Sequence, residues 1–145
     1  MTGNADQERA DRFARTLMQQ AAWPAAVVAA ANSLAPLAAS ARGAFETLPA
    51  AIALSVSAAS AVAVLALSAL LVFDALLFRL MASHKAAGGA AVDDMLGRMR
   101  LKPSPSTPRP LDDRIAGSRR LLFKQRFALA VFAAALLTAG FWAPL

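Results

Sequence analysis

The sequence predicts an all-α integral membrane protein, a two-span helical hairpin with an N-terminal amphipathic or interfacial helical arm. Residues 48–73 are 26 consecutive uncharged residues, and residues 127–145 are 19 more. About 20 suffice to cross a hydrocarbon layer of about 30 Å. Hydrophobic residues make up 58% of the 145 residues, against roughly 45–50% in soluble proteins. The basic residues that give a net charge of +6 gather beside the apolar runs, which favours a membrane surface over nucleic acid as their partner.

The N-terminal arm, residues 1–47, begins with a polar segment of mixed charge. Asn4 and Gln7 resemble a capping box, and Phe13 and Leu17 fall four apart on one helix face. These spacings predict a short amphipathic helix over residues 1–15.

Residues 16–41 carry no charge, but they include the amides Gln19, Gln20 and Asn32 and two prolines. Inserting a Leu or Val at the bilayer centre is favourable by only about 0.3 to 0.6 kcal/mol. The few Leu and Val residues here therefore offset little of the cost of burying the amide side chains. We therefore expect an interfacial or partner-packed helix. A third span at 16–41 is one alternative. A cleaved signal peptide is another, because arginines precede the segment and a small-residue pattern ends it.

The first span is expected over residues 48–78. Pro49 lies near its start, where a missing amide costs little, and the run continues through Asp74 to Arg79, which can snorkel. The second span is residues 127–145. Trp142 suits the headgroup region as a membrane-interface anchor, and Pro144 follows it.

Residues 79–126, between the spans, hold 11 of the 15 basic residues and four acids. The positive-inside rule makes this a cytoplasmic loop, with the C-terminus on the opposite side, and we expect a bacterial inner membrane. A third span would place the N-terminus beside the loop. An interfacial arm would leave it opposite. Within the loop we expect a short amphipathic helix from Val92, a Pro-rich spacer at 103–110, and a helix from Leu111 that continues into the second span.

Asp74 is the main candidate for chemistry, because an acid inside a membrane span is a functional candidate by default. It is a candidate intramembrane polar contact between helices. An interfacial acid that reaches water near Arg79 and a proton-carrying carboxylate are the alternatives.

Two further sets of residues are candidates for contact. Small residues four apart predict helix-packing faces, with a second row at Ala53, Ser57 and Ala61. The main row of the first span is Ala51, Ser55, Ala59 and Ala63, and that of the second span is Ala130, Ala134 and Thr138. Basic residues of the loop, in its short helix and immediately before the second span, predict contact with anionic lipids or an acidic partner. They are Arg98, Arg100, Lys102, Arg119, Arg120, Lys124 and Arg126.

Composition excludes much catalytic chemistry. The chain has no Cys and no Tyr, and His84 is its single His. Thiolate nucleophiles, zinc–thiolate sites, multi-His metal sites and His-based triads therefore lack a necessary part. We find no motif for a cofactor, a phosphate loop or paired catalytic carboxylates, and we expect a protein that is not an enzyme and binds no nucleic acid.

These observations favour a small accessory or assembly subunit of a larger membrane complex. Its partners would be the bilayer with its anionic lipids and other membrane subunits, favoured over copies of itself. A self-assembling, holin-like pore is the alternative, although a pore should carry a continuous polar stripe that the spans lack. A small proton-coupled transporter would rest on Asp74 alone.

Overall fold

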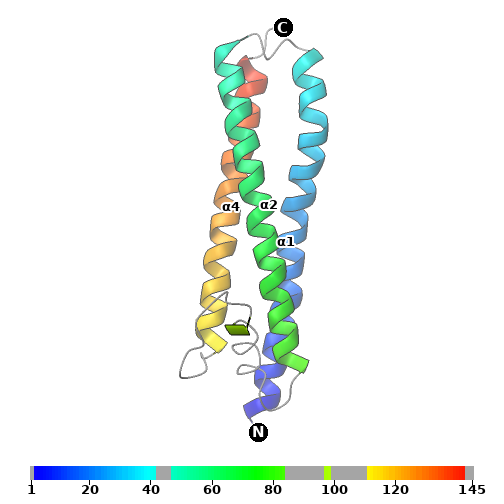
Figure 1. Ribbon diagram of the computed structural model, residues 1–145, viewed down its shortest axis with the longest axis vertical. Helices are drawn as coiled ribbons and strands as arrows, with labels where there is room; N and C mark the ends of the chain where they lie inside the picture. The colour runs from blue at the N-terminus through cyan, green and yellow to red at the C-terminus, as the bar shows by residue number, and fades with distance from the viewer. Residues whose placement is uncertain (1, 42–46, 84–96, 99–110, 143–145) are drawn as a thin grey trace. The chain divides into compact units, whose positions relative to one another are not determined.

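The structure, a computed structural model, describes residues 2–41, 47–83, 97–98 and 111–142. Within these ranges the chain forms three long helices and no strand (Figure 1). They are α1 (Thr2–Ala41), α2 (Leu48–Ser83) and α4 (Leu111–Trp142). The all-helical prediction is confirmed for the described part of the chain.

All three helices are long and apolar enough to cross a membrane, judged by length and composition. The candidate spans are Gln7–Ala41, Leu48–Leu80 and Leu111–Phe141. The expected two-span hairpin with an interfacial arm is therefore not confirmed, because α1 adds a third candidate. The membrane character expected of the chain is supported.

Helix α1 runs without interruption through the boundary expected near residue 15. Its 40 residues correspond to about 60 Å at a rise of 1.5 Å each. Alanine, the strongest helix former, dominates residues 21–41 and favours helix across both internal prolines. Pro24 is buried and Pro36 is exposed. Each removes one i→i−4 hydrogen bond from the helix.

Helices α2 and α4 begin as their sequences suggest. Pro49 is the second residue of α2, and the Ala51 amide donates to the Thr47 carbonyl oxygen at 3.0 Å. Asp112 and Asp113 lie in the first turn of α4, where negative charge complements the helix dipole. Helix α4 is continuous from Leu111 into the expected second span. The short helix expected from Val92 and the spacer at 103–110 lie outside the described residues, except that positions 97 and 98 are helical.

Buried positions repeat every seven residues along each helix. In α4 the repeat is Ser118, Gln125, Phe132 and Ala139, all at most 3% exposed. Other repeats of this spacing are Ala14, Ala21 and Val28 in α1, and Ala50, Ser57, Val64, Leu71 and Phe78 in α2. A seven-residue repeat is typical of long helices that pack at a shallow angle with interlocking side chains.

The chain divides into two compact units, each formed from one segment of every helix. The first unit comprises Met1–Gln20 and Leu70–Leu121, and the second comprises Ala21–Ala69 and Leu122–Leu145. Of the 15 basic and 9 acidic residues, only Arg42, Glu46, Lys124 and Arg126 fall in the second unit. The first unit is thus the polar one, and the second has the composition of a membrane domain.

The core of the second unit is a cluster of Val28 from α1, Ala61 and Val64 from α2, and Phe132 from α4. Partly buried residues packed against it are Ala31, Ala128, Leu129 and Leu136. A smaller contact joins Ala39 of α1 to Ala50 of α2. All three helices therefore contribute to this unit.

Candidate functional site

Asp74 forms a polar contact between α2 and α4 inside the first unit. The Ser118 hydroxyl donates to Asp74 Oδ2 at 2.8 Å, and the same hydroxyl lies 3.3 Å from the carbonyl oxygen of Arg114, one turn earlier in α4. Ser118 is 2% exposed, and Asp74 is half-buried. The carboxylate therefore faces α4, and a serine that the sequence analysis did not single out is its partner.

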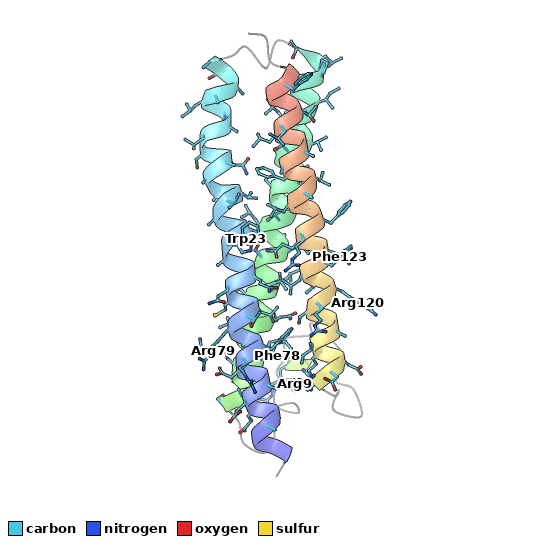
Figure 2. The ribbon with its side chains drawn as sticks, turned by 180° about the vertical axis from the view of Figure 1, so that it is seen from behind. Arg9, Trp23, Phe78, Arg79, Arg120 and Phe123 are labelled. Carbon is cyan, nitrogen blue, oxygen red and sulfur yellow. The ribbon has the colours of Figure 1, made fainter. Side chains whose placement is uncertain are left out.

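Two further contacts in the first unit join α1 to the same helices. Arg9 forms an ion pair with Asp112 at 2.9 Å, with both side chains more than half exposed. The rings of Phe13 and Phe78 meet edge to face, with centroids 5.1 Å apart. Figure 2 shows Phe78 beside α1, with Arg79 of the next position directed outward. An exposed ion pair contributes little to stability. The contact between the two phenylalanine rings therefore contributes more to holding α1 against α2.

A second polar contact between α2 and α4 lies inside the second unit. Gln125 Nε2 donates to the Ser68 hydroxyl oxygen at 2.7 Å, and that hydroxyl donates to the carbonyl oxygen of Val64 at 2.8 Å. Gln125 is 1% exposed and Ser68 is 5% exposed. Among the described residues, no fully buried side-chain nitrogen or oxygen lacks a hydrogen-bond partner. Both polar contacts are therefore satisfied within the chain.

The described basic candidates of the loop lie on the surface. Those described, Arg98, Arg119, Arg120, Lys124 and Arg126, are all exposed, and Arg100 and Lys102 lie outside the described residues. Figure 2 shows Arg120 and Phe123 on α4, both directed away from the neighbouring helices. Phe123 and Phe127 are 73% and 66% exposed, so bulky apolar rings flank Lys124.

The small-residue rows fall on both sides of their helices. In α2 the row Ser55, Ala59 and Ala63 is exposed and Ala51 is half-buried, whereas Ala53, Ser57 and Ala61 are buried. In α4 the row Ala130, Ala134 and Thr138 is exposed, while its neighbours Ala135 and Ala139 are buried. The structure thus uses one row of each helix internally and leaves the other facing outward.

Aromatic residues stand near both ends of the second unit's apolar segments. Trp142 is the last residue of α4, and the adjacent Phe141 is 83% exposed. Trp23 of α1, which the sequence analysis passed over, is 53% exposed and is labelled on α1 in Figure 2. Its position between polar Gln20 and the Ala-rich segment is the signal that could have identified it as an interface residue.

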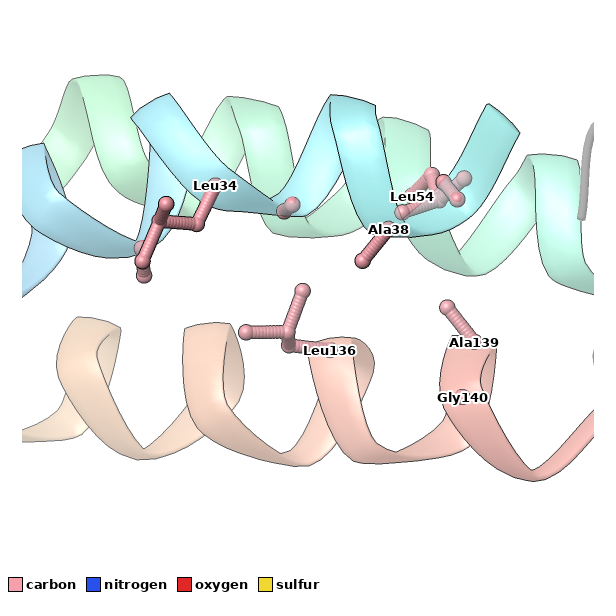
Figure 3. A pocket seen from close by; sticks show the side chains of 9 residues that line it. Leu34, Ala38, Leu54, Leu136, Ala139 and Gly140 are labelled. Atoms are coloured by element: carbon pink, nitrogen blue, oxygen red, sulfur yellow. The ribbon is translucent and has the colours of Figure 1, made fainter. Parts of the chain in front are cut away.

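An apolar groove of about 390 Å³ opens between α1 and α4 in the second unit. In Figure 3, Leu34 and Ala38 of α1 face Leu136 and Ala139 of α4 across it. Its other lining residues are Ala31, Ala35, Ala39, Leu54 and Gly140. A methyl group added at Gly140 would meet nothing within 4 Å. Six of the nine lining residues are alanine or glycine.

The described residues contain no group of three or more His, Cys, Asp or Glu that could hold a metal ion. The chain matches no protein-family model, and comparison with curated proteins and with solved structures gave no significant match. What the geometry offers is two interhelical polar contacts, outward rows of small residues and an exposed basic and aromatic region on α4.

Proposed function

We propose that the chain is a small accessory or assembly subunit of a larger membrane complex, acting by helix packing in the bilayer. One observation carries the proposal, namely how little of each candidate span is covered. Buried residues make up 33% of the most apolar window of α2, 17% of that of α1 and 11% of that of α4. Lipid is as apolar as leucine, so association of spans depends on close packing. The outward rows of small residues provide surfaces for such packing.

We place the chain in a bacterial inner membrane with three spans, both the N-terminus and residues 84–110 in the cytoplasm, and the C-terminus opposite. Charge supports this arrangement, because Arg42 and Glu46 are the only charged residues expected on the far side. Aromatic spacing agrees with it. Trp23 is 18 residues from the end of α1, and Phe123 is 18 residues before Phe141. Eighteen helical residues span about 27 Å, close to the hydrocarbon thickness.

Exposed basic residues on α4 would then meet the cytoplasmic headgroups. Each Lys or Arg near an anionic leaflet contributes about 1 kcal/mol of attraction. Lys124 and Arg126 stand among exposed phenylalanines, so their long stems can lie along the acyl region while the charges reach phosphate. This contact would fix depth and orientation in the bilayer.

The test is purification of tagged chain from native membranes in mild detergent, followed by native gels and mass spectrometry. We expect a stoichiometric set of other membrane proteins. The variant Ala59→Leu adds bulk to the outward row of α2 and should reduce their recovery. The matched control Ala30→Leu adds the same bulk to the face of α1 that already carries Trp23 and Leu34, and should leave recovery unchanged. Recovery of the chain alone, as a ladder or ring, would contradict the proposal and favour a pore or a homo-oligomeric transporter.

Orientation is tested separately by thiol labelling, which is direct because the chain has no cysteine. Single cysteines at Thr2→Cys and Ser104→Cys should react with an impermeant reagent from the same side, and a cysteine added after Leu145 from the other. Labelling of Thr2→Cys together with the C-terminus would instead support an interfacial α1.

A further inference from the structure

Helix α4 carries four exposed basic residues within eight consecutive positions. They are Arg119, Arg120, Lys124 and Arg126. None of their side chains forms an ion pair or a hydrogen bond in the part of the chain that the structure describes. The two acids of α4 lie in its first turn, at Asp112 and Asp113. The described carboxylates of the chain therefore do not compensate the positive charge of residues 119–126.

The arginines of α1 are the opposite case. Each of the three forms an ion pair with a carboxylate. The pairs are Arg9 with Asp112, Arg12 with Glu8, and Arg15 with Asp11. The charge of α1 is thus compensated at close range, whereas that of α4 is directed to its surroundings. A partner of this part of α4 should therefore carry negative charge.

Two exposed phenylalanines lie among these basic residues on the same continuous helix. Phe123 and Phe127 are one turn apart, and they are 73% and 66% exposed. Successive residues of an α-helix are turned by about 100°, which places the basic residues in two pairs about these rings. Arg120 and Lys124 form one pair, and Arg119 and Arg126 form the other. Arg120 and Phe123 are labelled on α4 in Figure 2.

The combination of rings and charges favours a lipid over a soluble anion. In the topology proposed above, these residues lie at the cytoplasmic boundary of the bilayer, because residues 127–142 of α4 carry no charge. Long basic side chains at such a boundary lay their stems along apolar surface and extend the charge to phosphate. A phospholipid supplies phosphate for the charges and acyl chain for the rings. An acidic protein in the cytoplasm would supply only the first.

We propose that residues 119–127 of α4 form a binding site for an anionic phospholipid that carries two phosphate groups. Each phosphate contacts one basic pair, and the acyl chains cover Phe123 and Phe127. Because the rings lie between the two pairs, a lipid with a single phosphate engages one pair and leaves the other without an anion. The site therefore selects one lipid class, which goes beyond a general attraction to an anionic leaflet.

This inference rests on the proposed insertion of α4, but it requires neither α1 as a span nor other subunits. Labelling of the C-terminal cysteine from the same side as Ser104→Cys would remove its premise. Weak lipid binding would overturn the inference and leave both the topology and the accessory-subunit proposal intact.

The experiment is native mass spectrometry of the purified full-length chain in mild detergent, titrated separately with three phospholipids. One has two phosphates, one is anionic with a single phosphate, and one is zwitterionic. We expect one two-phosphate lipid per chain, bound about tenfold more tightly than the single-phosphate lipid, with the zwitterionic lipid weakest. Equal affinity for the two anionic lipids would overturn the proposal. So would equally tight binding of inorganic pyrophosphate, which has two phosphates and no acyl chain.

Charge variants then locate the site. Arg120→Gln combined with Lys124→Gln removes one basic pair and should weaken binding of the two-phosphate lipid about tenfold. The matched control, Arg12→Gln with Arg15→Gln, removes the same charge from α1, where carboxylates already compensate it, and should change the affinity less than about twofold. Equal losses in the two double variants would mean that net charge alone drives binding, and would refute the site.

A ring variant tests the apolar part of the site. Phe123→Ala should weaken binding of the lipid and leave the weak binding of pyrophosphate unchanged, because only the lipid has acyl chains to cover the ring. Circular dichroism confirms that each variant remains helical. An unchanged lipid affinity in Phe123→Ala would refute the role of the ring.

Discussion

The hydrogen bond between Gln125 and Ser68 gives the sharpest test of how the second unit is held together. Three variants form a double-mutant cycle, namely Ser68→Ala, Gln125→Met and the combination. Methionine keeps the length of the glutamine side chain while removing its donors and acceptor, so the packing of α4 on α2 is largely preserved. The cycle therefore isolates the polar contact.

The two single variants should differ in cost. Ser68→Ala leaves the Gln125 amide, 1% exposed and 2.7 Å from its lost partner, without an acceptor. A buried donor left unsatisfied costs about 1–3 kcal/mol. Gln125→Met should cost only about 0.5–1 kcal/mol, because the Ser68 hydroxyl still donates to the Val64 carbonyl at 2.8 Å. In the double variant no buried polar group is stranded, so its cost should fall well below the sum of the two.

Reversible unfolding in mixed micelles, titrated with a denaturing detergent and followed by circular dichroism, gives the free energy of each variant. A control cycle uses Ser55→Ala, whose exposed hydroxyl donates only to its own helix at the Ala51 carbonyl, with Gln125→Met. Its two effects should add. If Ser68→Ala costs less than Gln125→Met, or if the Ser68 cycle is additive within about 0.3 kcal/mol, the argument from a stranded donor is refuted.

Three further predictions concern the first unit, and the same titration measures them. Gly117→Ala should stabilise the chain by about 0.5–1 kcal/mol, since the added methyl group meets nothing within 4 Å and glycine is a poor helix former; a loss of stability would contradict this. Asp112→Ala should change stability by less than about 1 kcal/mol, because its ion pair with Arg9 is exposed, and a larger loss would indicate a further role. Asp74→Asn keeps an oxygen that can accept from Ser118, so it should cost less than Asp74→Leu; equal costs would mean that this hydrogen bond does not stabilise the unit.

Helix α1 shows why sequence alone identified two spans where the structure has three candidates. Residue-by-residue insertion energies count Gln19, Gln20 and Asn32 against a span and give alanine little weight. Helix formation depends on other properties, because alanine favours helix in any environment and outweighs isolated prolines. Pro24 is even buried in the unit's interior. The long apolar runs in α2 and α4 are identified correctly because they carry almost no charge and because leucine, valine and phenylalanine favour insertion into the bilayer.

The polar contacts between α2 and α4 could be predicted only in part. Asp74 is identifiable as an acid inside an apolar run, but its partner depends on the alignment of two helices that are far apart in the sequence. Ser118 and Gln125 carry one usable signal, a seven-residue spacing that Phe132 and Ala139 continue. Residues 111–126 are predicted to be helical, but their charge places them in the cytoplasmic loop, where the sequence gives no reason to expect contact with the first span.

Apolar and polar contacts contribute to helix association in different ways in this chain. Apolar contacts such as that between Val64 and Phe132 fill space, but in lipid they gain little over contact with acyl chains. A hydrogen bond such as Gln125 to Ser68 penalises every alignment that separates the two residues, since each alternative leaves a buried amide unpaired.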